Sequence, residues 1–295
     1  MSKILPGLSR ARIIFYGLMI FSSIGCSPQN LEETVSMPRK IEIHANQSAK
    51  ELLKLGGDQV KVINRPPGVN FYSIDWPRSS LGTVQIRSGA HVVEIPSVLG
   101  VAGSDDPNFA EENIINWQIY AGISDQELMN HDEARQRFFA ILQSLRNAGW
   151  VRAVRVSEPR LKGREALHYL QTRALVYSLD PDYVLSLKEW MSLEDRTTWS
   201  FYCDHAYLDI SITRDPSRND LAKPGAYFVE YSLRSENERW RAVVGPAKRV
   251  NWKAELPAAL SAQQRLRALA EDELKKNHIP IDEAYRDPPV PRLGP

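Results

Sequence analysis

The chain has 295 residues, of which 37 are Lys or Arg and 36 are Asp or Glu, so its formal net charge is +1 at pH 7. Hydrophobic residues make up 43% and charged residues 25%, a globular balance that argues against wholesale disorder, collagen and coiled coil. The near-zero charge argues against a nucleic-acid-binding protein that depends on bulk charge, and two cysteines are too few for a disulfide-stapled scaffold.

The first residues have the pattern of a secretory signal. Lys3, Arg10 and Arg12 are basic, no acid stands among the first twelve positions, and an apolar run at 13–21 is followed by two serines. A basic region, an apolar region and small residues in this order are typical of a signal peptide. Because the apolar run is shorter than the ~20 residues of a membrane-spanning helix, residues 1–25 are predicted to be a removable signal.

Cys26 directly follows this signal, in the sequence Ser23-Ile24-Gly25-Cys26-Ser27. The segment resembles the lipobox of bacterial lipoproteins, with Ser23 where that family usually has Leu. The resemblance implies that Cys26 is the lipid attachment site, carrying acyl chains such as palmitate, each CH₂ of which contributes about 0.8 kcal/mol to membrane anchoring. Ser27 in place of Asp implies delivery to the outer membrane, facing the periplasm. A plain secretory signal with an incidental cysteine is the alternative.

Residues 26–40 are polar and irregular, and are predicted to be a lipidated tether. From position 41 onward, short runs of β-branched and aromatic residues alternate with Pro and Gly, which predicts strands at 59–64, 71–75, 83–87 and 91–95. The last two runs flank Ser88-Gly89-Ala90 and predict a hairpin. Residues 41–120 are therefore expected to form an N-terminal β-rich part.

Helical patterns begin in the next part of the chain. Ser124 and Glu127 have the spacing of a capping box, which predicts a helix start at Ser124. Residues 132–148 give the clearest helical pattern, and Gly149 is expected to end that helix. Its predicted apolar face consists of Phe138, Ile141, Leu142 and Leu145.

Shorter elements follow. Helices are predicted at 162–172 and 185–191, and strands at 150–156, 199–203, 207–214 and 225–234. The mixed charges of residues 234–241 (RSENERWR) predict a turn or a solvated sheet edge. A last helix is predicted at 258–276, and the proline-rich end at 287–291 is expected to be extended. The predicted inward face of that helix consists of Ala262, Leu266, Leu269, Ala270 and Leu274.

The predicted elements do not alternate as strand-helix-strand units. This order favours an α+β fold with mainly antiparallel sheets, a long central helix and a C-terminal helix. Residues 121–295 are expected to form a C-terminal α+β part, which can share one core with the N-terminal part.

Motifs for catalysis or for metal and cofactor binding do not stand out. The sequence has no His-Glu-x-x-His, no paired cysteines, no Gly-x-Ser-x-Gly and no phosphate-binding glycine loop. We therefore predict no catalytic residue, no metal ligand and no cofactor. Cys203 is expected to be a buried apolar residue, Asp132 to cap a helix, and Asp204-His205 to form a turn with an exposed histidine.

Seven tryptophans are spread over the chain, and most of them are expected to lie in the core. Trp240, between two arginines, and Trp252, before Lys253, are the candidates for partly exposed positions. Because aromatic side chains anchor many protein interfaces, these two residues are the predicted partner-binding positions.

Four segments carry a further resemblance, at 131–150, 159–163, 177–181 and 189–191. In style, over much of residues 70–290, they are similar to proteobacterial lipoproteins, some of which resemble immunity proteins paired with type VI secretion effectors, notably lipases. The resemblance implies a non-catalytic protein on the periplasmic side of the envelope that binds a toxic secreted effector and blocks its active site. Membrane anchoring would raise the effective concentration of such an inhibitor.

Two other functions stay open at the level of the sequence. The protein can be an envelope lipoprotein that scaffolds an outer-membrane complex or assists its assembly. It can also be a periplasmic hydrolase, because catalytic groups that are distant in sequence leave no local motif. In all three interpretations the partner or substrate lies in the envelope, and none involves nucleic acid.

Overall fold

The computed structural model describes residues 39–65, 68–173 and 176–291. Cys26, the predicted signal peptide and nearly all of the predicted tether therefore lie outside the described residues. Within these ranges, no helix combines the length and the apolar character needed to cross a bilayer.

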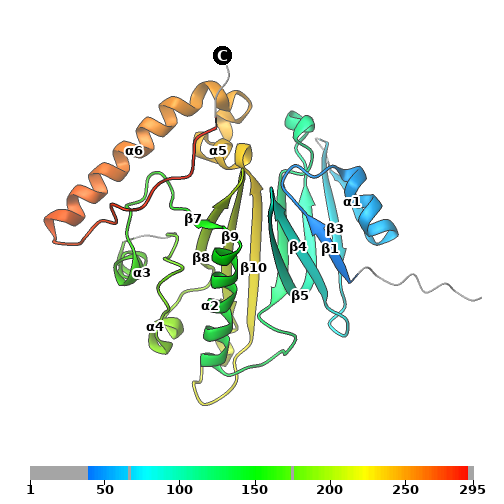
Figure 1. The fold of residues 1–295 in the computed structure, drawn as a ribbon, viewed down its shortest axis with the longest axis horizontal. Coiled ribbons are helices and arrows are strands. Elements are labelled where there is room, and N and C mark those ends of the chain that lie inside the picture. Colours follow the sequence, from blue (N-terminus) through cyan, green and yellow to red (C-terminus); the bar gives the residue numbers. More distant parts are fainter. Residues whose placement is uncertain (1–38, 66–67, 174–175, 292–295) are drawn as a thin grey trace, which may run out of the picture. The chain divides into compact units, whose positions relative to one another are not determined.

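The strands of the described residues join into one ten-stranded sheet (Figure 1). They are β1 (Lys40–Ile43), β2 (Lys61–Arg65), β3 (Val69–Asp75), β4 (Gly82–Ser88), β5 (His91–Ser104), β6 (Asn116–Gly122), β7 (Val151–Arg152), β8 (Thr197–Cys203), β9 (Ala206–Arg214) and β10 (Tyr227–Ser235). The main path runs β1-β4-β5-β6-β10-β9-β8-β7, while β3 also pairs with β5 and β2 with β3. The pair β1–β4 is parallel and the other strand pairs are antiparallel.

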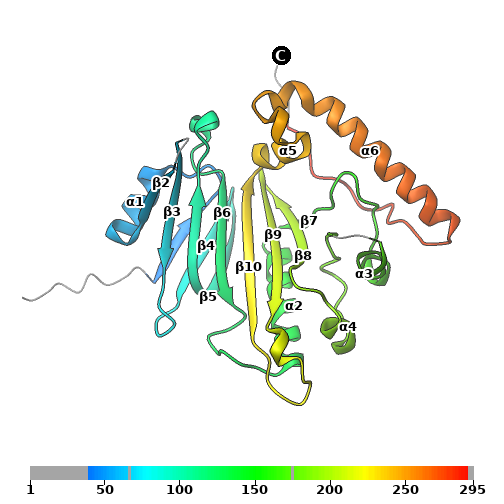
Figure 2. The same ribbon diagram turned by 180° about the vertical axis from the view of Figure 1, so that it is seen from behind.

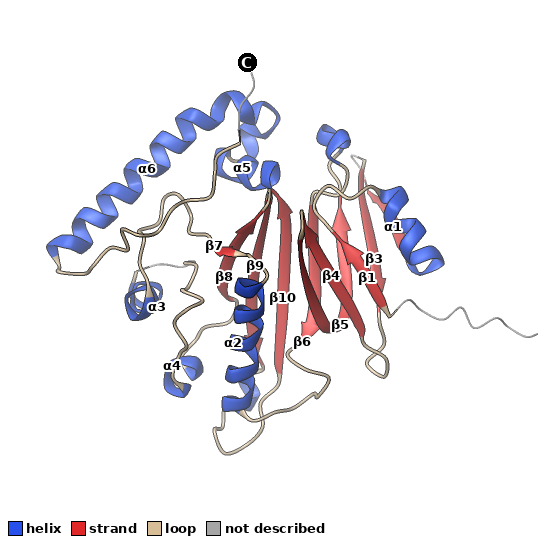
Figure 3. Cartoon of the chain, viewed as in Figure 1, coloured by secondary structure: helices blue, strands red, loops and turns tan. Residues whose placement is uncertain are grey.

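Six α-helices accompany this sheet within the described ranges (Figure 3). They are α1 (Ala49–Gly56), α2 (His131–Asn147), α3 (Gly163–Thr172), α4 (Leu187–Met191), α5 (Glu236–Val244) and α6 (Trp252–Lys276). Strands and helices do not alternate regularly along the chain, and the sheet is mostly antiparallel. The predicted α+β class, with a long central helix and a C-terminal helix, is confirmed.

Helix α2 covers one face of the C-terminal strands. In Figure 1 it lies in front of β9 and β10, and in the reverse view of Figure 2 it lies behind them. Its predicted apolar face is confirmed, because Phe138, Leu142 and Leu145 are fully buried and Ile141 is half-buried. The ring of Phe138 lies 4.8 Å from that of Trp199 on β8, between ring centroids. The same hydrophobic cluster extends from β1 to α6.

The helix start predicted at Ser124 is wrong. Ser124 Oγ accepts a hydrogen bond from the amide of Gln126 at 3.1 Å, and residues 123–128 form bends and irregular backbone. The helix begins instead at His131. Its cap is Asn130, whose side chain accepts a hydrogen bond from the backbone amide of Asp132, so the prediction of Asp132 as the cap is wrong. Of the strand predicted at 150–156, only β7 forms.

Residues 234–241 are also not the turn that their charges suggest. They form the end of β10 and most of α5. Ser235 caps this helix by accepting from the amide of Glu238 at 3.3 Å. The charge pattern suggested a solvated edge, but two of the charged side chains, Arg241 and Glu236, are buried.

The inward face predicted for the last helix is largely wrong. Leu266 and Leu269 are 54% and 68% exposed, whereas Leu274 is buried as predicted. Two charged residues, Arg267 and Glu271, occupy the buried side of α6. Each of them binds backbone or an opposite charge in residues 155–160 or 287, so polar and ionic contacts hold the middle of the helix in place of the predicted apolar stripe.

Candidate functional site

The face of the sheet opposite α2 is polar. Along β6, β9 and β10, buried residues such as Ile119, Ile210 and Val229 alternate with half-buried residues such as Gln118, Asp209 and Glu230. A strand points successive side chains to opposite faces, so the first set meets α2 and the core and the second set forms the other face. We call this second face the outer sheet face; Figure 2 shows it, with α5 and α6 beyond one end of the strands.

The outer sheet face crosses seven strands, from β2 through β3, β5, β6, β10 and β9 to β8. Residues that are directly opposite in neighbouring antiparallel strands share a face. Three cross-strand rows follow from the register: Ile63, Phe71, Ser104, Asn116, Arg234, Tyr207 and Tyr202; then Lys61, Ser73, Ala102, Gln118, Ser232, Asp209 and Ser200; then Asp75, Gly100, Tyr120, Glu230, Ser211 and Thr198.

The two ends of this face differ in character. At the β2–β3 end, Ile63 and Phe71 are 49% and 40% exposed. In the middle, the ring of Tyr120 stacks on that of Phe228 with centroids 6.0 Å apart. At the β8–β9 end the first row runs under α5. The β2–β3 end therefore offers exposed apolar contacts beside the exposed ion pair of Lys61 and Asp75, whereas arginines gather at the β8–β9 end.

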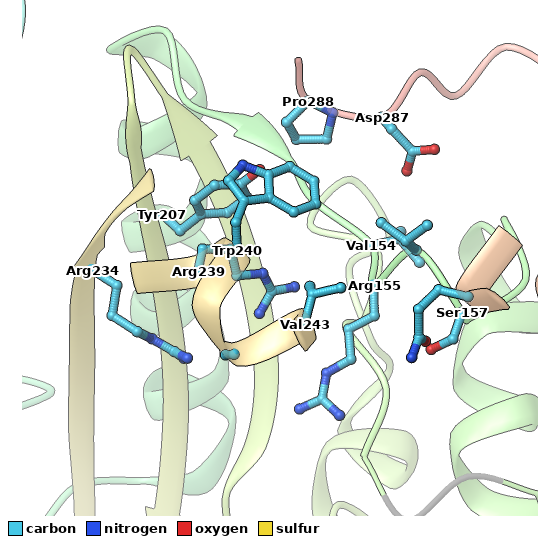
Figure 4. Close-up of a pocket in the computed structure, with 13 residues that line it drawn as sticks. Val154, Arg155, Ser157, Tyr207, Arg234, Arg239, Trp240, Val243, Asp287 and Pro288 are labelled. Atoms are coloured by element: carbon cyan, nitrogen blue, oxygen red, sulfur yellow. The ribbon is translucent and has the colours of Figure 1, made fainter. Parts of the chain in front are cut away.

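A cavity of about 420 Å³ opens where the first row meets α5 (Figure 4). It is lined by three arginines, one carboxylate, two aromatic rings and apolar side chains, among them Val154, Arg155, Tyr207, Arg234, Arg239, Trp240, Asp287 and Pro288. The carboxylate of Asp287 pairs with Arg267 on α6. We call it the arginine cavity. Figure 4 shows that the arginines come from three separate elements: Arg234 from β10, Arg239 from α5 and Arg155 from the segment after β7.

The three arginines have unequal partners. Arg234 forms an ion pair with Asp209, whereas within the described ranges neither Arg155 nor Arg239 has a carboxylate within ion-pair distance. The guanidinium carbon of Arg239 lies 5.3 Å from the centre of the Tyr207 ring. Burial lowers the pKa of Arg239, and the charges of Arg234 and Arg155 lower it further, while Asp209 opposes them. Arg155 and Arg239 thus keep guanidinium groups that no carboxylate of the described residues pairs with, although Asp287 lines the same cavity.

A second cavity, of about 230 Å³, adjoins the first over the sheet. The same three arginines line it, together with Arg196 and with hydroxyl and carboxylate side chains of the second and third rows. Its charged lining consists of four arginines against Asp209 and Glu230. Arg234 Nε, at this end, is buried without a hydrogen-bond partner in the described structure, as is Gln118 Oε1 on β6 in the middle of the sheet. Such atoms cost free energy unless a ligand or water satisfies them.

The structure does not place the residues that were predicted as site residues on an exposed surface. Cys26 is outside the described residues. The expected partial exposure of Trp240 and Trp252 is wrong, because each is only 3% exposed. Trp240 nevertheless lines the arginine cavity, while Trp252 packs in a small apolar cluster with Phe109 and Leu256. No sequence pattern points to Arg155, and the charge pattern of residues 234–241 predicts a solvated turn for Arg239.

Other reactive groups are either buried or engaged. Cys203 is buried as predicted, and burial raises the pKa of its thiol to about 11. His205 is exposed in the predicted turn, and its Nδ1 lies 2.8 Å from Glu236 Oε2. Among the described residues, no group of three or more His, Cys, Asp and Glu is placed to hold a metal ion. The arrangement with the clearest chemical capacity is the arginine cavity, which can bind an anion.

Comparisons with protein-family models, with curated proteins and with solved structures find no match to this chain.

Proposed function

We propose that the protein is a periplasm-facing lipoprotein that binds a toxic secreted effector, of lipase type, and neutralises it without catalysis. The outer sheet face, with the arginine cavity at its end, is the proposed contact surface. Cys26 is the proposed membrane anchor, which keeps the binding body at the surface where a lipase acts.

The observation that carries the proposal is the unpaired positive charge in the arginine cavity. A half-buried guanidinium, Arg239, stands beside two further arginines and has no anionic partner in the described structure. Stability alone does not favour this arrangement, because desolvating a charge is costly and like charges repel. Charged groups held in such a state are characteristic of binding sites, where the partner supplies the missing counter-charge.

The dimensions of the outer sheet face suit a protein partner. Seven strands about 4.8 Å apart span about 29 Å, and three rows of alternate residues add about 14 Å, so the rows cover roughly 400 Å². A typical specific interface buries about 800 Å² on each partner. A partner of ordinary size would therefore cover the rows and continue over the arginine cavity and α5.

The test is a competition between sibling cells in the native host. A strain that lacks this protein should lose to a parent that secretes its effectors, and the full-length protein should restore survival. Ser211→Trp, in the third row, should remove protection because a bulky side chain there separates the two surfaces. Gln264→Trp, on an exposed position of α6, is the matched control and should protect fully.

Two results would contradict the proposal. One is normal survival of the deletion strain against a secreting parent. The other is an envelope defect of the deletion strain when it grows alone, with no added loss in competition; this would indicate a scaffold or assembly factor instead.

A further inference from the structure

We propose that the arginine cavity is the anchor site for a carboxylate side chain, Glu or Asp, on the protein partner. This inference rests on the proposed function, which it deepens by naming the chemistry that the partner presents. The partner carboxylate lies between Arg239 and Arg155, and the adjoining partner backbone lies over the second and third rows of the outer sheet face.

The hydrogen-bond donors of the cavity match a carboxylate. A guanidinium is planar and presents paired N–H groups, which bind the two oxygens of a carboxylate in parallel. Arg234 already donates from Nη2 to one carboxylate oxygen of Asp209. Arg239 and Arg155 line the same cavity without such a partner in the described structure, so one incoming carboxylate satisfies donors from two elements.

The walls of the cavity suit an amino-acid side chain. Val154, Val243 and Pro288 provide apolar surface, and Tyr207 and Trp240 provide aromatic surface, around the charged end. The methylene stem of a Glu or Asp can pack against these groups while its carboxylate meets the arginines. A free inorganic anion makes no use of an apolar wall.

The surrounding charge argues for a single acidic side chain rather than a polyanion. Asp287 lines the arginine cavity itself, and Asp209 and Glu230 stand among the four arginines of the adjoining cavity. These carboxylates would repel a second closely spaced negative group. Nucleic acid and anionic lipid surfaces present many such groups and are bound by extended basic patches. The neutral hydroxyls of Ser211, Ser232 and Thr198 suit instead the backbone of a protein segment.

The binding of a defined probe tests this inference directly. An acetylated, amidated glycine peptide with a single central Glu, the Glu–Gly peptide, should bind the full-length protein and should quench the fluorescence of Trp240, identified by comparison with Trp240→Phe. The corresponding Gln–Gly peptide should bind more than about tenfold more weakly, a difference of about 1.4 kcal/mol. Affinity for the Glu–Gly peptide should fall as salt rises.

Variants locate the site. The double variant Arg155→Gln with Arg239→Gln should weaken binding of the Glu–Gly peptide more than about tenfold, at an unchanged melting temperature. Arg239→Lys keeps the charge but loses the paired donors, so it should bind with intermediate affinity. Arg265→Gln removes an exposed arginine from α6 and should bind like the unaltered protein.

The outcomes separate this inference from the proposed function. Equal binding of the Glu–Gly and Gln–Gly peptides, unchanged affinity in the double variant, or displacement of the Glu–Gly peptide by inorganic phosphate at equal concentration would overturn the carboxylate site. If protection in the sibling competition still depends on Ser211, the proposed function survives that failure. Carboxylate binding without any protection would leave the cavity assignment standing and overturn the immunity function.

Discussion

Arg241 shows how a single charged residue organises one end of the molecule. Its side chain is fully buried, and its Nη1 and Nη2 donate to the two carboxylate oxygens of Glu112 at 2.9 and 2.7 Å. Its Nε donates to Glu238 at 2.9 Å, and its guanidinium lies 3.9 Å above the centre of the Phe109 ring. This group links α5 to the segment between β5 and β6, far away in sequence.

Glu112→Gln should lower the free energy of unfolding by about 3 kcal/mol, because it leaves the buried charge of Arg241 with one carboxylate in place of two. Urea unfolding followed by fluorescence measures the change. Glu111→Gln, at the exposed neighbouring position, is the control and should change stability by less than about 0.5 kcal/mol. Equal losses in the two variants would show that the buried ion pair does not stabilise this end of the fold.

His205 gives a pH-dependent prediction. The hydrogen bond to Glu236 raises the pKa of His205 above its ordinary 6.5. A raised folded-state pKa contributes stability that is complete below the ordinary value and disappears as pH rises through the folded value. The backbone at His205 has φ of 65°, which Asn adopts readily. His205→Asn should therefore cost more stability at about pH 5.5 than at about pH 8.5.

Urea unfolding of both proteins at the two pH values checks this prediction. Glu236→Gln in the background of His205→Asn should add no further pH dependence between these values. A stability difference that stays constant or grows with pH would mean that the ion pair with Glu236 does not form.

At the same residue scale, the environment of a side chain is hard to predict from its sequence neighbours when those neighbours point in different directions. Arg239, Trp240 and Arg241 are consecutive, but successive helical residues are about 100° apart. They therefore face three environments: a cavity lined by other arginines, an apolar cluster and a buried ion pair. Flanking charges suggested that Trp240 is partly exposed, and the helix places it in the interior instead.

At the scale of elements, the Ser-x-x-Glu pattern illustrates what local signals can predict. Ser186 and Glu189 form a complete capping box at α4, and Ser235 with Glu238 starts α5. Ser124 and Glu127 have the same spacing and start no helix. A cap contributes about 1 kcal/mol, which is too little without an apolar face to bury. After Ser124 the chain instead extends to a bridge between Met129 and Gly225.

Helix α6 gives a matched pair of substitutions. Leu274 is 2% exposed and Leu269 is 68% exposed. Leu274→Ala should lower the free energy of unfolding by about 2–5 kcal/mol through loss of burial and the cavity left behind, and Leu269→Ala by less than about 0.5 kcal/mol. Thermal or urea unfolding of the two variants checks this order. A larger effect at Leu269 would mean that the outward side of α6 packs against something in the folded state.

At the scale of the whole molecule, the sequence predicted the class of fold and the solvated side of single strands better than the arrangement of strands. Alternation over residues 207–214 predicted one buried and one polar face, as β9 shows. The pairing of β6 with β10 left no local signal, because it joins Gln118 to Ser232 across 114 positions. The outer sheet face and the arginine cavity depend on such distant pairings, so neither was predictable.

The predicted lipid anchor at Cys26 determines where the whole protein is located in the cell. Cys26→Ser should move the protein from the membrane to the soluble fraction and abolish labelling by palmitate, because the thiol is the proposed attachment point. Fractionation with radiolabelled or clickable palmitate measures both. Cys203→Ala is the control and should stay labelled and membrane-bound. A Cys26→Ser protein that still takes up palmitate would refute the lipobox interpretation.

The long-range pairing of β6 also constrains how the chain folds as it emerges from synthesis. A polypeptide that emerges N-terminus first completes β6 well before β10 is delivered, so the backbone donors and acceptors on one side of β6 stay open in the interval. Open strand edges of this kind recruit other chains and aggregate. We expect the nascent protein to need a holding chaperone until its last third has emerged, and premature termination before β10 to yield insoluble fragments rather than a stable amino-terminal half.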